Sequence, residues 1–434
     1  QSSALPLGHA ASKDSQESFR YNNSRKPISL LIICNGHGED IIALEIIKRL
    51  LKLNKYEKIE AMPLVGKGSA FDCINHNDFK KIGFQQVLPS GGFCNQSING
   101  LILDLKAGVL WYLLKNFLIV RKKLKKHYKL IAIGDLVPLL FASFSRSDFG
   151  FIGTPKSDYT WMSGPGNSLL DLYHKWKGSE WDPWEIYLMK SSRCKFIIVR
   201  DKITALNLNK KKINASFFGN PMMDFVKDTY KVPENINSYR RIILLIGSRF
   251  PEAFRNLERF LCSLDAFKYK SKCLIFVPLS SNADLHKIEN YFMNHNFIRH
   301  NNSYCLFNEE SCWRKKNIFV LLGKNTFSQW ANFAEIGLAN AGTATEQIAG
   351  LGIPSLSLPG DGPQFTKNFA IRQQRLLGGS VIVCEDKATL IRNLLDLLND
   401  EQLRKKQAKY GVLRMGKRGA SERIVDYIHL KLSS

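Results

Sequence analysis

The first group of residues able to do chemistry follows an apolar run and precedes a helical pattern; it comprises Asn35, Gly36, His37, Gly38, Glu39 and Asp40. Glycines after a strand let the backbone approach a ligand at the carboxyl edge of a parallel sheet. The two acids complement a helix dipole but repel phosphate, so we expect a ligand with hydroxyls or an amine. His37 is a candidate general base. The alternative is a tight turn with a dipole-capping pair of acids.

A second group, later in the chain, has the residue types of a diphosphate site; it comprises Gly342, Thr343, Ala344, Thr345, Glu346 and Gln347. It follows a predicted strand and begins a short helical pattern. Gly342 permits close approach, and threonine hydroxyls and the free N–H groups of a helix start can hold phosphates. Glu346 or Gln347 can then contact ribose hydroxyls. The alternative is an ordinary turn between a strand and a helix.

Further candidates lie at other predicted strand ends. One strand ends in Gly247, Ser248 and Arg249. An arginine there is a bidentate phosphate partner or a plain surface residue. The Gly/Pro-rich loop 360–365 is followed by Asn368, and it contains Gln364; both offer amide donors. In the first half, Asp135 follows a strand and is either a base for a sugar hydroxyl or a helix N-cap.

The segment 98–126 combines large apolar residues, Trp111 and Phe117 among them, with the basic run 121–126. Such a surface is typical of helices that dock on an anionic membrane, and we predict that both aromatic residues face the lipid. The alternative is a core helix with a solvated basic end. No stretch of the sequence is apolar and long enough to span a bilayer.

Alternating strands and helices must position these groups. Short apolar runs alternate with longer helical patterns, which is typical of parallel sheets covered on both faces. The alternation is interrupted at 229–239, which we interpret as a linker. We therefore predict an α/β protein of two Rossmann-like domains, 27–228 and 240–414, whose parallel sheets face across a cleft. Residues 1–26 are expected to be a flexible extension, and a helix in 415–434 can pack back on the first domain.

The composition indicates the general class of protein and the partners that it can bind. The 434 residues are 44% hydrophobic with a net charge of +24, which fits a globular protein that meets phosphates or an anionic membrane, or a lysine-rich coding bias. The aromatic residues lie mostly in apolar runs, so we expect no nucleic-acid binding. Nine cysteines without a C-x-x-C pair fit buried thiols in a reducing compartment, and the scattered histidines predict no metal site.

Several motifs, in order, resemble lipid-A-disaccharide synthase and its relatives, inverting glycosyltransferases of the two-Rossmann GT-B fold. These motifs are Gly219-Asn220-Pro221, Gly247-Ser248-Arg249 and Gly342-Thr343-Ala344-Thr345. The segments 35–40, 219–224 and 360–365 look closest to the cyanobacterial lipid-A-disaccharide-synthase-related branch. The chain departs from the family at 134–138, where the synthases carry Asp-Ala-Pro-Asp-Phe-Asn, and at Gln347, which takes the position of the ribose-binding acid.

The resemblance implies a hexosyltransferase that moves a sugar from a nucleotide-sugar, with UDP as the expected nucleotide, to a lipid or amphipathic acceptor by direct displacement. Asp135 or His37 would deprotonate the acceptor. The residues expected to bind the acceptor are Asn35, Gly36, Gly38, Glu39 and Asp40. We expect no cofactor, because a helix dipole and an arginine can replace a metal, and a cytoplasmic protein held peripherally at the membrane. A nucleotide-sugar epimerase on the same fold, or an inactive nucleotide-sugar-binding protein, is the alternative.

Overall fold

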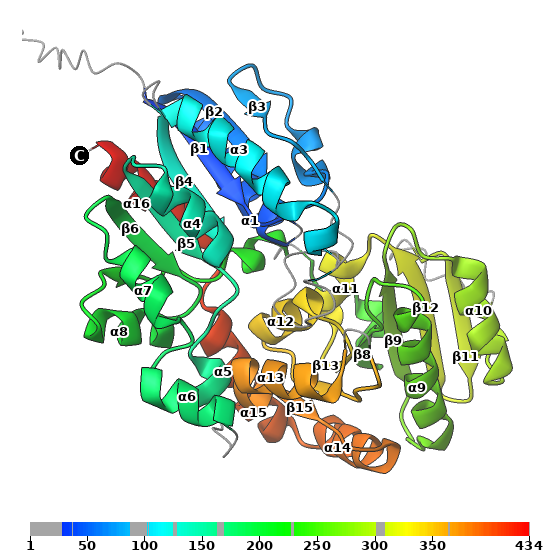
Figure 1. Cartoon of the computed structure of the whole chain (residues 1–434). Coiled ribbons are helices and arrows are strands. Elements are labelled where there is room, and N and C mark those ends of the chain that lie inside the picture. The colour runs from blue at the N-terminus through cyan, green and yellow to red at the C-terminus, as the bar shows by residue number, and fades with distance from the viewer. Residues whose placement is uncertain are drawn as a thin grey trace, which may run out of the picture.

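The computed structural model describes residues 28–36, 38–86, 102, 104–124, 128–162, 169–226, 230–300, 309–362 and 365–433. The predicted extension 1–26, His37, Gln364 and parts of the segment 98–126 lie outside the described residues. Two sheets are built from consecutive parts of the sequence (Figure 1). We call the parts 28–226 and 230–415 the N-terminal and C-terminal halves.

The N-terminal half contains a seven-stranded parallel sheet with the order β3-β2-β1-β4-β5-β6-β7. Side chains of β1 alternate between the two faces: Ile32 packs with the helix α1, and Ile33 packs in the core on the other face. Burial on both faces explains the uniformly apolar strands. The strands are β1 (Ile28–Cys34), β2 (Tyr56–Pro63), β3 (Phe79–Lys81), β4 (Tyr128–Gly134), β5 (Phe149–Gly153), β6 (Cys194–Val199) and β7 (Ala215–Ser216). The helices are α1 (Gly38–Lys52), α3 (Val109–Leu124), α4 (Leu136–Phe144), α5 (Tyr159–Met162), α6 (Leu169–Lys177), α7 (Pro183–Met189) and α8 (Lys202–Lys210), with 3₁₀ helices at Ser69–Cys73 and Pro221–Phe225.

The C-terminal half contains an eight-stranded sheet with the order β10-β11-β12-β9-β8-β13-β14-β15. The strands are β8 (Arg240–Leu245), β9 (Cys273–Leu279), β10 (Ile298–Arg299), β11 (Ser311–Lys315), β12 (Ile318–Lys324), β13 (Ile336–Ala339), β14 (Ser355–Ser357) and β15 (Val381–Val383). The helices are α9 (Glu252–Ala266), α10 (Leu285–Asn294), α11 (Phe327–Phe333), α12 (Thr343–Gly350), α13 (Lys367–Leu377), α14 (Lys387–Asn399) and α15 (Glu401–Met415), with 3₁₀ helices at Glu234–Ile236 and Gly378–Ser380.

One edge of the second sheet differs from the predicted parallel arrangement. The strands β10, β11 and β12 pair antiparallel, whereas β12 pairs parallel with β9. Only two residues, Lys316 and Asn317, separate β11 from β12, and a connection that short can join only antiparallel neighbours. Lys316 has φ +55°, as such tight turns require.

The chain passes between the halves twice. The first passage includes the predicted linker 229–239, whose residue Ile236 is fully buried in the core of the C-terminal half. The second runs from α15 to α16 (Ala420–Ser433), the red helix that lies with the N-terminal sheet in Figure 1. Ile424 and Ile428 of α16 belong to the same buried cluster as Ile42 and Ile46 of α1. Among the described residues, no helix is long and apolar enough to cross a bilayer.

Candidate functional site

The carboxyl ends of β1, β4, β5 and β6 meet at one edge of the N-terminal sheet. Asn35 follows β1 and lies against Gly134 at the end of β4. A Cβ on Gly134 would lie 2.9 Å from the Asn35 Cγ, and Gly134 has φ +136°, so both space and backbone require glycine here. The Asn35 Oδ1 is buried and accepts no hydrogen bond from the described residues. A buried acceptor without a partner is unusual in a folded protein, and the acceptor-binding role of Asn35 stays a prediction.

Glu39 lies in the first turn of α1 and contacts Thr154, which follows β5. The Thr154 hydroxyl donates a hydrogen bond to the Glu39 Oε1 over 3.2 Å. Burial raises the pKa of Glu39 to about 7, and the negative charge of Asp135 adds to the increase, while the hydrogen bond from Thr154 opposes it. A carboxyl group with a pKa near 7 can take up and release a proton at neutral pH.

Two other members of the first group face inward. Asp40 is buried and accepts a hydrogen bond from the Cys34 thiol over 3.0 Å. A Cβ on Gly36 would lie 2.5 Å from the Val65 carbonyl oxygen, so this glycine is explained by packing within the half. Gly38 is the first residue of α1. The acceptor-binding roles of these residues stay predictions.

Asp135 is the N-cap of α4. Its Oδ1 accepts a hydrogen bond from the Val137 backbone N–H over 3.2 Å, and its side chain is largely buried. The sequence predicts either this capping role or a role as a base for Asp135. The cap occupies one carboxylate oxygen, so it is compatible with a role as a base, which stays a prediction.

The helix α12 begins at the carboxyl edge of the C-terminal sheet. Its N-cap is Gly342, and no side chain caps the first turn. Such a terminus presents N–H groups and a positive dipole end to an anion. Thr343 is exposed, and Ala344 is partly buried. Thr345 is fully buried, and its hydroxyl donates to the Ala341 carbonyl over 2.7 Å, so of the two threonines only Thr343 is accessible; its role in binding a nucleotide stays a prediction.

A buried amide network fixes the approach to α12, and the sequence analysis missed it. Asn340 donates to the Leu358 carbonyl over 2.6 Å and accepts from its N–H over 3.0 Å, which joins the ends of β13 and β14. Asn340 also donates to Asn256 of α9 over 3.2 Å. Gln373 of α13 donates to the Gly342 carbonyl over 3.1 Å. The sequence around an asparagine or glutamine does not show whether its side chain belongs to such a network or caps a helix.

The remaining predicted donor-site residues that the structure describes lie at the same edge. Gly247 follows β8 with φ +92°, and Ser248 and Arg249 beyond it are exposed. Asn368, in the first turn of α13, is exposed as well. An exposed arginine next to the strand ends is accessible to a diphosphate.

Two arginines of α9 line the loop that follows β14, and neither was predicted. Arg255 donates to the Gly362 carbonyl over 2.8 Å. A Cβ on Gly360 would lie 2.0 Å from the Arg259 guanidinium carbon, so the loop packs directly on this cation. Together with Arg249 they make this edge electropositive, which favours an anionic ligand.

Several contacts between described residues join the halves, and two of them involve α12. Arg200 follows β6, and its guanidinium pairs with the Glu346 carboxylate of α12 over 2.7 Å; the side chains are 9% and 15% exposed. Burial acts to lower the pKa of Arg200, but the Glu346 charge raises it above its usual value. Gln347 donates to the Met222 carbonyl over 3.0 Å. Both candidates for the ribose contact thus bind the N-terminal half, and the ribose role of either stays a prediction.

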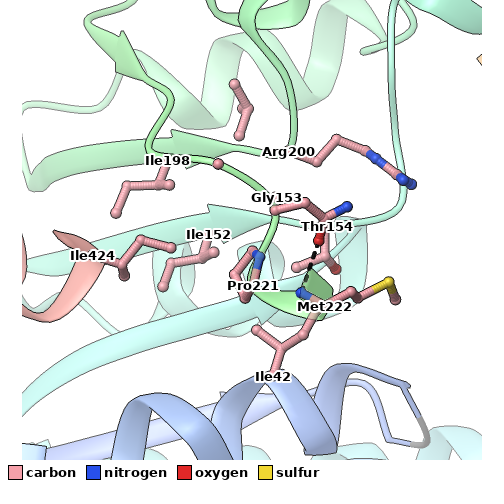
Figure 2. A pocket seen from close by; sticks show the side chains of 12 residues that line it. Ile42, Ile152, Gly153, Thr154, Ile198, Arg200, Pro221, Met222 and Ile424 are labelled. Atoms are coloured by element: carbon pink, nitrogen blue, oxygen red, sulfur yellow. Dashed lines mark hydrogen bonds between the residues drawn. The ribbon is translucent and has the colours of Figure 1, made fainter. Parts of the chain in front are cut away.

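A small cavity lies behind Arg200. Its volume is about 10 Å³, and Figure 2 shows Ile152, Ile198 and Ile424 around it, with the Arg200 guanidinium pointing away. A volume of that size holds about one water molecule. A sugar or a nucleotide is therefore too large to bind in this cavity.

The outer face of α3 is apolar and basic, as predicted for the segment 98–126. Trp111 and Leu118 are 63% and 57% exposed, and Lys122 is exposed on the same face. The prediction for Phe117 is wrong, because its ring packs edge-on against Phe141 in the core, with the centroids 5.6 Å apart. A residue one position along a helix points about 100° away, which separates Phe117 from Leu118.

Comparisons with known proteins identify the fold. No protein-family model and no curated protein matches the sequence. CalG4, the calicheamicin glycosyltransferase, is similar with a TM-score of 0.58 and 12% identity over 94% of this chain and 99% of its own. MurG from Acinetobacter baumannii gives 0.55 and 12% over 93% and 100%. A UDP-GlcNAc 2-epimerase from Neisseria meningitidis, bound to UDP-GlcNAc, gives 0.52 and 16% over 94% and 100%. The chain therefore has the GT-B fold, which confirms the predicted fold class.

Proposed function

We propose that the protein is a glycosyltransferase that moves a hexosyl unit from a UDP-sugar to a lipid or amphipathic acceptor. One observation carries this proposal. Glu39, whose pKa is about 7, and the start of α12, which no side chain caps, lie on either side of the Arg200–Glu346 contact. One edge offers a proton acceptor and the other an anion site. The motifs shared with lipid-A-disaccharide synthase and its relatives support a sugar nucleotide as donor.

In the proposed reaction the acceptor hydroxyl attacks the anomeric carbon from the side opposite the diphosphate. Its proton passes to the carboxylate of Glu39 or Asp135, the bond from the anomeric carbon to the phosphate oxygen breaks, and UDP leaves. Arg249, Thr343 and the N–H groups at the start of α12 stabilise the charge that develops on the leaving group. His37 is the alternative base.

The lipid character of the acceptor is proposed from the family resemblance and from α3. The exposed Trp111 and Leu118 lie beside Lys115 and Lys122, so apolar contact and positive charge occur on one helix face. We propose that this face docks on an anionic membrane, where apolar side chains enter the interface and lysines bind acidic headgroups.

The donor site is tested by thermal shift with UDP-, GDP-, ADP- and dTDP-sugars. A ligand at 100 times its Kd adds about 2.7 kcal/mol of stability. Arg249→Ala should weaken UDP binding by about 1.5–3 kcal/mol, the range of a charge-assisted hydrogen bond. Arg299→Ala, an exposed arginine on the edge strand β10, is the matched control. Unchanged UDP affinity in Arg249→Ala would remove this residue from the site.

Product analysis separates the proposed reaction from its alternatives. Release of UDP that depends on an added acceptor supports transfer. An epimerised UDP-sugar formed without acceptor would identify an epimerase, and binding without turnover would identify an inactive binding protein.

Membrane docking is tested by flotation with vesicles of anionic and of neutral lipids. The wild type should bind anionic vesicles, less at high salt because ions screen surface charge. Trp111→Ser combined with Leu118→Ser should abolish binding and leave the melting curve cooperative. The control pair, Leu413→Ser with Leu430→Ser, changes leucines of α15 and α16 that are equally exposed. Equal binding by both double variants would contradict the proposal.

A further inference from the structure

A cluster of metal-binding side-chain types lies between α9 and α10, apart from the proposed sugar-transfer site. Glu258, Cys262 and Asp265 share one face of α9, and His295 follows the last turn of α10. Ligand atoms of Glu258, Cys262 and His295 all lie within 4.8 Å of one another. Cys262 and His295 are far apart in the sequence, which is why ligand spacing along the chain predicted no metal site.

The His295 ring is held in place through its Nδ1. This nitrogen lies 2.6 Å from the Asp265 Oδ2, and the His295 side chain is only 10% exposed. Lys315 fixes the arrangement, since its ammonium donates to Asp265 over 2.6 Å and to the His295 carbonyl over 2.7 Å. A carboxylate on one imidazole nitrogen is the usual partner of a histidine that binds metal through the other.

The other ring nitrogen faces the two remaining side chains. The His295 Nε2 lies 3.1 Å from the Glu258 Oε2, and the Cys262 Sγ lies 3.4 Å from the Glu258 Oε1. Bonds of about 2.0–2.3 Å in a tetrahedral zinc site place neighbouring ligand atoms about 3.3–3.8 Å apart. A thiolate and a carboxylate together carry two negative charges, which balance a divalent cation when the imidazole is neutral.

We propose that Glu258, Cys262 and His295 bind one zinc-like divalent cation, with a fourth position open to solvent. The mixed sulfur, nitrogen and oxygen set suits Zn²⁺ and disfavours Mg²⁺ and Ca²⁺, which prefer oxygen ligands alone. Binding displaces the thiol proton of Cys262 and any proton on the His295 Nε2. The cation joins α9 to α10, so it stabilises the helix that also carries Asn256 and Arg259 of the donor edge.

Titration of the full-length, chelator-treated protein with Co²⁺ tests the site. Wild type should bind one Co²⁺ with a thiolate-to-cobalt absorption band, and added Zn²⁺ should remove the band. Cys262→Ser should lose the band and the Zn²⁺-dependent rise in melting temperature. Cys73→Ser, which changes an exposed free thiol of the N-terminal half, should keep both. A band that is missing in wild type, or that persists in Cys262→Ser, would overturn the proposal.

A second measurement needs no variant. Wild-type protein is alkylated with iodoacetamide with and without Zn²⁺, and each cysteine peptide is quantified by mass spectrometry. Zinc should protect Cys262 at least tenfold and leave Cys73 unchanged. Equal labelling of Cys262 under both conditions would refute binding at this site, whatever the variants do.

Discussion

Glu39→Gln is expected to make the protein more stable at alkaline pH and to remove part of its pH dependence. Glutamine keeps the oxygen that accepts from Thr154 but cannot ionise. In the wild type, burial raises the pKa of Glu39 from its ordinary value of 4.5 to about 7. Between these two values the folded state retains the proton that the unfolded chain has released.

The sign and size follow from linkage. Because the folded state binds more protons in this window, the free energy of unfolding falls as the pH rises from about 4.5 to about 7. The difference between these two pKa values corresponds to roughly 3 kcal/mol of stability, which is fully present below about pH 4.5 and fully lost above about pH 7. Asp158, whose pKa burial raises to about 6, contributes in the same direction in both proteins, so it cancels from their difference.

Urea denaturation of both proteins at several pH values between 4 and 8 measures the effect. The variant's stability minus that of the wild type should increase by about 3 kcal/mol over this range, with most of the change below pH 7. In an Asp135→Asn background the change should shift to lower pH, because the Asp135 charge helps to raise the pKa of Glu39. Parallel curves for wild type and Glu39→Gln would show that Glu39 titrates normally and would refute the reasoning.

Two further predictions follow from the same contacts. Arg200→Ala should lower the free energy of unfolding by about 3–5 kcal/mol, because it leaves the Glu346 carboxylate buried and unpaired; urea denaturation measures this, and removing Glu346 as well should recover part of the loss. Asp135→Asn should lower kcat by about 10²–10⁴-fold with UDP binding intact, as expected for a general base, and near-normal turnover would transfer that role to Glu39 or His37.

Much of the fold could be predicted because buried parallel strands leave a strong local signal. The apolar runs Ile28–Cys34 and Ile336–Ala339, for example, are the strands β1 and β13. The missed strands are β3, β10 and β11 (Ser311–Lys315), which lie at a sheet edge or next to one. β3 (Phe79–Lys81) has three residues, two of them lysine, and β10 (Ile298–Arg299) has two. A strand at a sheet edge needs no continuous apolar run. The periodicity and hydrophobicity of the sequence therefore do not reveal such strands.

The candidate site could be predicted only as far as its strand ends. Asn35 follows an apolar run directly, and Arg249 follows one after two residues, so the sequence predicts that both lie at a sheet edge. The sequence does not show which acid of a neighbouring pair faces that edge, because successive helical residues point about 100° apart. Glu39 faces Thr154, whereas Asp40 faces the core. The Arg200–Glu346 contact joins residues 146 positions apart, and nothing near either one signals the other.

The segment 219–224 holds structural elements together and carries no side chain with an assigned role in the proposed reaction. A Cβ on Gly219 would lie 2.6 Å from the Lys417 carbonyl oxygen, so the glycine permits the crossing from α15 to α16 to pack here. Met222 supplies the carbonyl that binds Gln347 of α12, and Asp224 accepts two backbone N–H groups at the start of α16, both over 2.7 Å. One short segment thus contacts both α12 and the chain crossing. We expect the motif to influence the proposed reaction through structure, because its contacts help to fix the position of α12 relative to the N-terminal half.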